Sequence, residues 1–164
     1  MKVWGVRGGK RHDPGALFWI GEMIENEDDE EKTTDIGLFN YAVSYWRAAQ
    51  ALRGIKIEAT HSKAVICFLY YHAVELFLKS YLRLHKASLR ELRKWGHDVN
   101  ILAKKCHRHG LEFDPHEEEV FDLIREDMMK ARYLKTGYYQ RAGFEALERT
   151  TKWLYEEIAI AMTE

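Results

Sequence analysis

The scarcity of proline constrains this chain more than any other feature of its sequence. Only Pro14 and Pro115 occur in 164 residues, which leaves a stretch of 100 residues without the residue that most reliably breaks a helix. Apolar residues recur there at three- and four-residue steps, and no segment shows convincing period-two alternation. The sequence therefore predicts an all-α fold. Because its connections are short, we expect an antiparallel up-and-down bundle of four to five helices.

Capping residues and glycines mark where the helices begin and end. A threonine or aspartate precedes the first apolar period, and Pro115 follows Asp114 at a first helical turn. The densest apolar run lies between Val65 and Leu84, so we expect it in the central helix. The expected helices run from 34 to Gly54, about 59 to 85, 88 to 96, 98 to 110, 115 to Gly137 or Gly143, and 144 to 162.

The length fits one globular domain preceded by a short leader. Residues 1–35 combine several glycines with an acidic run and predict a partly irregular leader, whereas residues 36–164 form the predicted helical domain. No apolar run reaches the ~18–20 residues that span a bilayer, so we expect a soluble, cytoplasmic protein without a membrane partner. Cys67 and Cys106 belong to no paired metal or redox motif, and we expect no metal and no cofactor.

The net charge of −1 conceals strongly charged blocks. Residues 79–110 carry nine lysines and arginines against Glu91 and Asp98, a local charge of +7, whereas residues 22–35 and 111–127 carry −7 each. The basic block can attract a phosphate backbone or an acidic partner. The alternative is that the acidic segments fold back and neutralise it within one bundle.

The central helix carries three polar residues on one face. His72, Glu75 and Lys79 are separated by three and four positions, which brings their side chains together on a helix. An exposed ion pair of this kind is structural and contributes only ~0.3–0.5 kcal/mol. The functional alternative is that these groups point into a cleft and orient a phosphate or a base.

A series of short motifs resembles the HEPN family of small helical domains. The residues are Ala73-Val-Glu-Leu-Phe-Leu-Lys79, then Gly96-His-Asp98 before a helix that contains Leu102, and then Arg132-Tyr133; the resemblance spans about residues 36–160. It implies a four- or five-helix up-and-down bundle that is often a homodimer. Many members are ribonucleases in toxin, defence or RNA-processing systems, while others are binding modules or non-catalytic partners of nucleotidyltransferases.

The resemblance also implies what catalysis would require. Active members use an arginine, four to six intervening residues and a histidine, brought together across a dimer, and need no metal. A histidine can transfer protons and an arginine can stabilise phosphoryl charge. That spacing occurs at Arg7 to His12 and at Arg90 to His97, about as often as chance predicts, and no histidine follows Arg132 at this spacing. Arg90 and His97 are the candidate pair; otherwise His97 bonds a neighbouring backbone or acidic group at a helix start.

We therefore expect a non-catalytic HEPN-like module that binds RNA or a nucleotide, in a defence, toxin–antitoxin or RNA-processing context. The first alternative is a metal-independent endoribonuclease that uses Arg90 and His97 across a homodimer. The second is a protein-interaction partner of a nucleotidyltransferase. The predicted RNA- or nucleotide-binding residues are Lys79, Arg83, Arg90, Arg93, Lys94, Arg132 and Tyr133, of which the last two belong to a second basic and aromatic patch at 132–141.

Overall fold

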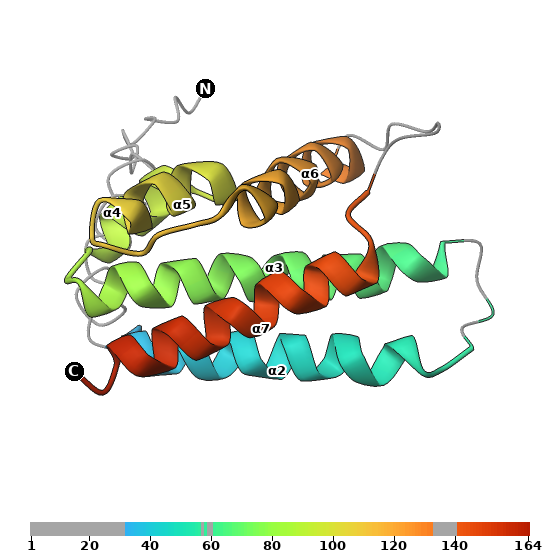
Figure 1. Cartoon of the computed structure of the whole chain (residues 1–164), viewed down its shortest axis with the longest axis horizontal. Helices are drawn as coiled ribbons and strands as arrows, with labels where there is room; N and C mark the ends of the chain where they lie inside the picture. Colours follow the sequence, from blue (N-terminus) through green and yellow to red (C-terminus); the bar gives the residue numbers. More distant parts are fainter. Residues whose placement is uncertain (1–31, 57, 59–60, 133–140) are drawn as a thin grey trace, which may run out of the picture. The chain divides into compact units, whose positions relative to one another are not determined.

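The computed structural model describes residues 32–56, 58, 61–132 and 141–164 (Figure 1). The chain divides into two compact units, Met1–Lys32 and Thr33–Glu164. The described residues of the second unit form six helices and no strand: α2 (Asp35–Arg53), α3 (Ser62–Leu84), α4 (Leu89–Trp95), α5 (Val99–His107), α6 (Pro115–Arg132) and α7 (Phe144–Ala161). The all-α prediction is confirmed. The six helices correspond to the six expected ranges, and the short pair α4 and α5 follows α3 where ranges 88 to 96 and 98 to 110 were expected.

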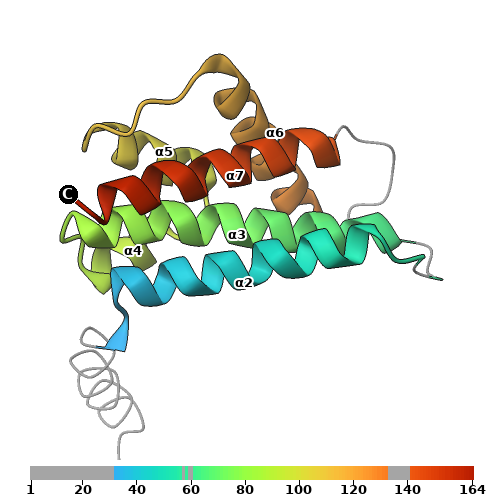
Figure 2. The same cartoon turned by 60° about the horizontal axis from the view of Figure 1, so that its bottom comes forward.

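The four long helices alternate in direction along the chain. In Figures 1 and 2, α2 runs against α3, and α7 runs in the same direction as α3. Helix α3 packs against α2, α5, α6 and α7, which makes it the central helix that its apolar sequence predicts. Its fully buried side chains include Tyr70, Phe77 and Leu82. Burying large apolar side chains on several sides of one helix supplies the main stabilising free energy of such a bundle.

By length and mean hydropathy, α3 also qualifies as a membrane-spanning helix. Within the segment Lys63–Leu84, a window of 18 residues has a mean hydropathy of 1.3, and 67% of that window is buried in the domain. The expectation that no segment is long and apolar enough to span a bilayer is therefore too strong. Burial of this kind is what the core helix of a soluble bundle requires.

Local capping explains where most helices begin. The Thr34 hydroxyl accepts a hydrogen bond from the Gly37 amide at 2.9 Å and starts α2, so this residue of the predicted leader already belongs to the helical domain. Ser88 forms a reciprocal capping box with Glu91 at the start of α4. The side chains of Asp98 and Asp114 accept hydrogen bonds from backbone amides at the starts of α5 and α6. The helix expected from Ala59 begins at Ser62, and Ala59 itself lies outside the described residues.

A carboxylate on α7 joins three helices. Glu148 accepts hydrogen bonds from the Tyr70 hydroxyl on α3 at 2.7 Å, the Trp46 indole on α2 at 3.0 Å and the Gln50 amide on α2 at 2.6 Å. Burial alone would raise the pKa of Glu148, but these donors outweigh it and lower the pKa. The charged carboxylate therefore fixes how α2, α3 and α7 pack.

Candidate functional site

A buried carboxylate lies at the centre of the candidate site. Glu75 on α3 is 1% exposed, and its Oε1 atom lies 2.7 Å from Lys79 Nζ and 2.8 Å from His97 Nδ1. His72 Nδ1 lies 3.9 Å from the other carboxylate oxygen, too far for a hydrogen bond but close enough for charge attraction. The predicted contact of His72, Glu75 and Lys79 is thus confirmed, and His97 joins them from a different segment.

The surroundings of Glu75 keep it ionised. Its burial disfavours the charged form and by itself raises the pKa. The nearby His72 ring and the Lys79 ammonium outweigh burial, and with His97 they lower the pKa to about 2. Glu75 is therefore a carboxylate at neutral pH, held by partners that supply positive charge or a hydrogen bond.

Two neighbouring residues fix the position of His97. Gly96 adopts a left-handed φ of 68° after α4, a conformation that costs glycine little, and its amide donates to Leu92 O. Asp98 caps α5 on the other side and pairs with Arg125 at 2.9 Å. The His97 side chain is 53% exposed, and its Nδ1 is bound to Glu75. Nε2 is the ring nitrogen that remains to give or take a proton.

The structure distributes the predicted binding residues over different roles. Lys79 is 14% exposed and pairs with Glu75. Arg83 donates hydrogen bonds to the carbonyls of Thr33 and Ala87, so it fastens the start of α2 and the end of α3. Arg90, Arg93 and Lys94 are exposed on α4. Arg132 is the last residue of α6, and Tyr133 lies outside the described residues with most of the predicted 132–141 patch.

One chain does not pair Arg90 with His97. No hydrogen bond or ion pair joins them among the described residues. Arg90 lies in the first turn of α4 and His97 beyond its last residue. At 1.5 Å of rise per residue, Arg90 lies ~7 Å along α4 from Trp95, and His97 follows two residues later, beyond the helix end. If the chain is a ribonuclease, the candidate pair Arg90 and His97 would therefore be joined across two copies of the chain.

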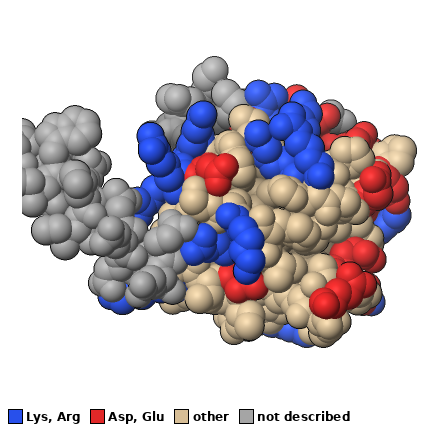
Figure 3. Space-filling model, turned by 90° about the vertical axis from the view of Figure 1, so that its left-hand side faces the viewer, with Lys and Arg blue, Asp and Glu red and all other residues tan. Residues whose placement is uncertain are grey.

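Exposed cations gather where α4 and α5 meet. This surface, the basic end, consists of Lys86, Arg90, Arg93 and Lys94, which are exposed, and the half-buried Lys105. Lys105 Nζ lies 5.1 Å from the centre of the Trp95 ring, which joins the basic residues of α5 to those of α4. Figure 3 shows lysine and arginine side chains gathered on this face. Lys86 and Lys105 are absent from the predicted set, although both lie in the basic block that the sequence shows.

The site contains no arrangement of metal ligands among the residues that the structure describes. Sequence reasoning missed the link between Glu75 and His97, which are 22 residues apart. One signal could have indicated it: Glu75 lies in a densely apolar helix, where a carboxylate needs partners.

Comparisons with known proteins identify the family. Neither curated proteins nor solved structures give a match to this chain. The family model described as HEPN domain matches residues 47–160, which include α3, α4, α5, α6, most of α7 and both partners of the Glu75–His97 contact. This match covers more than half of the chain, and the chain belongs to the HEPN domain family.

Proposed function

We propose that this HEPN protein binds RNA through its basic end. The observation that carries the proposal is the exposure of Arg90, Arg93 and Lys94 on α4 beside Lys105 on α5. Cations held on one surface release counterions from a phosphate backbone, which gives affinity without sequence preference. Lys79 and Arg83 are engaged within the domain and serve this surface only indirectly.

Titration of labelled single-stranded RNA at about 50 mM and about 200 mM salt tests the proposal. We expect the affinity for RNA to fall as the salt concentration rises. In the double variant Arg90→Gln, Lys94→Gln, the slope of log affinity against log salt concentration should be shallower by ~0.7 for each lost phosphate contact. Lys63→Gln is the matched control, because Lys63 is an exposed cation in the first turn of α3, at the far end of that helix from α4 (Figure 1). An equal loss in the control, or no binding at about 50 mM salt, would contradict the proposal.

The geometry of His97 favours endoribonuclease activity as a second candidate. Its ring is half exposed while its Nδ1 is held by a buried carboxylate, the arrangement that orients an imidazole for proton transfer at Nε2. In this mechanism His97 takes the proton of the ribose 2′-hydroxyl or protonates the leaving oxygen, and Arg90 of a second copy stabilises the charge on the phosphoryl group. Glu75 acts as a positioning residue.

Cleavage of a mixed RNA pool in EDTA separates binding from catalysis. For an endoribonuclease we expect cleavage that His97→Ala and Arg90→Ala each abolish, while RNA binding by His97→Ala remains near wild type. Binding without cleavage by the wild-type protein would overturn this second candidate and leave the binding function. If the protein neither binds nor cleaves RNA, the interaction with a nucleotidyltransferase becomes the leading explanation.

The proposal also includes the homodimer, the cytoplasmic location and the defence, toxin–antitoxin or RNA-processing context that the family resemblance and the sequence predict. These stay predictions. Among the described residues, an exposed strip on α2 and α3 offers a surface for a second copy: Tyr41, Val65 and Phe68 are 66%, 54% and 55% exposed. Contiguous exposed apolar patches commonly mark protein interfaces.

A further inference from the structure

A pocket of about 520 Å³ opens between α5 and α6, a size that suits a small molecule. Its apolar part consists of Ala103, Phe113 and Phe121, and the Phe113 ring stands edge-to-face to Phe121 with the ring centres 5.2 Å apart. Trp153 supports Phe113 from α7, with 5.6 Å between the ring centres. A flat apolar group can therefore rest against a fixed aromatic cluster.

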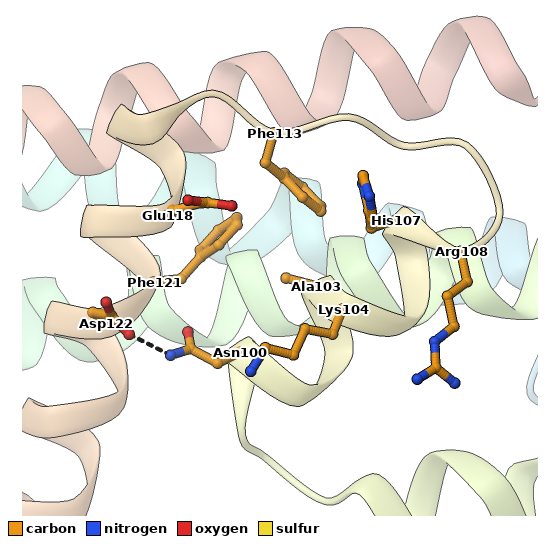
Figure 4. A pocket seen from close by; sticks show the side chains of 9 residues that line it. All are labelled: Asn100, Ala103, Lys104, His107, Arg108, Phe113, Glu118, Phe121 and Asp122. Carbon is orange, nitrogen blue, oxygen red and sulfur yellow. Dashed lines mark hydrogen bonds between the residues drawn. The ribbon is translucent and has the colours of Figure 1, made fainter.

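The two walls of this pocket carry opposite charges. Lys104 lies on α5, one turn before Arg108, which caps the end of that helix; Glu118 and Asp122 lie one turn apart on α6 (Figure 4). Among the described residues, no ion pair joins one wall to the other. In Figure 4, Lys104 extends along α5 toward α6, whereas the Arg108 guanidinium points away, so Lys104 is the cation placed to meet a ligand.

A hydrogen bond between α5 and α6 fixes one of the pocket's carboxylates. The Asn100 amide donates a hydrogen bond to Asp122 Oδ1 at 2.5 Å and holds that carboxylate at the pocket (Figure 4). The Asn100 side-chain oxygen is enclosed and has no hydrogen-bond partner within the described part of the chain. The Glu118 and Asp122 carboxylates accept hydrogen bonds, so this end of the pocket suits a group with several N–H donors.

From this arrangement we propose that the pocket binds a small aromatic zwitterion of the α-amino acid class. Its ring lies against Phe113, its ammonium group meets Glu118 and Asp122, and its carboxylate meets Lys104. The α-carbon places the ammonium and the carboxylate side by side at the mouth of the pocket, between the two walls. Lys104 lies on one side of the pocket and the Glu118 and Asp122 carboxylates lie on the other, so a zwitterion meets a complementary charge on both sides.

The same charges disfavour polyanions at this position. A phosphate group that approaches Lys104 also approaches the two carboxylates of α6, whose repulsion opposes binding. The pocket is therefore chemically distinct from the basic end, where cations dominate. The inference goes beyond the proposed RNA binding and does not depend on it.

Calorimetric titration with four probes tests the proposal: L-phenylalanine, its amide without the carboxylate, N-acetyl-L-phenylalanine without the ammonium group, and adenosine monophosphate. We expect saturable binding of L-phenylalanine, and at least ~10-fold weaker binding of each of the other three, since the loss of one charge-assisted contact costs about 1.5 kcal/mol or more. Binding of the amide and the N-acetyl compound as tight as that of L-phenylalanine, or preferred binding of the nucleotide, would overturn it.

Variants on each wall assign the contacts. Lys104→Gln should lower the affinity for L-phenylalanine at least ~10-fold but leave the affinity for the amide unchanged, because the amide lacks the carboxylate. Asp122→Asn should lower the affinity for L-phenylalanine and for the amide. The affinity for the N-acetyl compound should not change, because that probe lacks the ammonium group. Arg108→Gln is the matched control on α5 and should change little. Far-ultraviolet circular dichroism confirms that each variant is folded. If both wall variants weaken all three probes equally, or if L-phenylalanine does not bind the wild-type protein, the inference is wrong.

Discussion

Glu75 shows how one buried residue can serve both stability and chemistry. A carboxylate taken out of water needs compensating partners, and Lys79 and His97 both reach the same oxygen atom. Because the Lys79 ammonium remains close, His97 does not carry the whole compensation and can keep half of its surface exposed. A substitution at Glu75 should therefore affect stability and the orientation of the His97 ring together.

The pH dependence of stability tests the charge of Glu75. Its pKa of about 2 in the folded protein lies below the ordinary value of 4.5, so its stabilising effect is present above pH 4.5 and is lost as the pH falls toward 2. We expect Glu75→Gln to lower the free energy of unfolding by about 2 kcal/mol near pH 6, and the difference from wild type to shrink near pH 3. Urea unfolding at both pH values measures this.

Glu156→Gln is the matched control for that measurement. Glu156 forms an exposed ion pair with Lys152 at 3.6 Å, and such a pair contributes less than about 1 kcal/mol. A difference between wild type and Glu75→Gln that stays constant between pH 6 and pH 3 would mean that the lost stability comes from packing and not from charge.

Lys86 stores backbone strain at the end of α3. Its φ is 67°, in the left-handed region that a residue with a side chain disfavours. The next residue, Ala87, donates its amide hydrogen bond to Leu82 O at 3.0 Å, which ends the helix. We expect Lys86→Gly to be ~0.5–1 kcal/mol more stable than Lys86→Ala, because both remove the charge and only glycine relieves the strain. Thermal unfolding of the pair measures this, and equal stability would show that the strain is absent.

At the scale of the helices, local signals explain what could be predicted. Thr34, Asp98 and Pro115 act through neighbours within four residues, so the helix starts that they define can be found from the sequence. Gly96 and Gly110 adopt positive φ values after α4 and α5, which is why they mark helix ends. The division after α3 into two short helices follows from the same local signals, Ser88 and Gly96.

Local capping signals do not predict hydrogen bonds between helices. The contacts of Glu148 allow a test of how much such hydrogen bonds stabilise the bundle. We expect Tyr70→Phe to lower the free energy of unfolding by about 1.5–2 kcal/mol, because a buried hydroxyl that donates to a carboxylate is lost without a change in ring packing. Tyr155→Phe is the control, since its ring stacks on Phe39 with the ring centres 5.4 Å apart and should change stability by less than about 0.5 kcal/mol. Equal effects in denaturant unfolding would contradict the role assigned to Glu148.

At the scale of the whole domain, packing decides the features that the sequence could not show. Glu75 and His97 meet because α4 and its terminal glycine turn the chain back toward α3. At the pocket, the packing of α5 against α6 brings opposite charges to face each other, although both stretches taken alone look like ordinary solvated helix surfaces. The +7 block and the −7 block of residues 111–127 therefore adjoin within one domain, as one sequence-based alternative states, and still leave cations exposed at the basic end.

The predicted homodimer is tested at the exposed strip on α2 and α3. Tyr45 packs against the His72 ring with 4.4 Å between the ring centres, and Phe68 stacks on the same ring. Because His72 also lies beside Glu75, the strip adjoins the buried carboxylate of the candidate site. A second copy seated there would cover this aromatic surface and would bring Glu75 of one copy close to Glu75 of the other.

We expect sedimentation velocity to show a wild-type dimer that Phe68→Ser converts to a monomer with little loss of unfolding free energy, because Phe68 is already 55% exposed in the single chain. Ile160→Ser removes an equally exposed apolar side chain from α7 and should leave the dimer intact. A monomeric wild-type protein, or equal dissociation by both variants, would show that the strip is not the dimer interface. If the protein cleaves RNA, Phe68→Ser should abolish cleavage as well, because the proposed mechanism joins His97 of one copy to Arg90 of another.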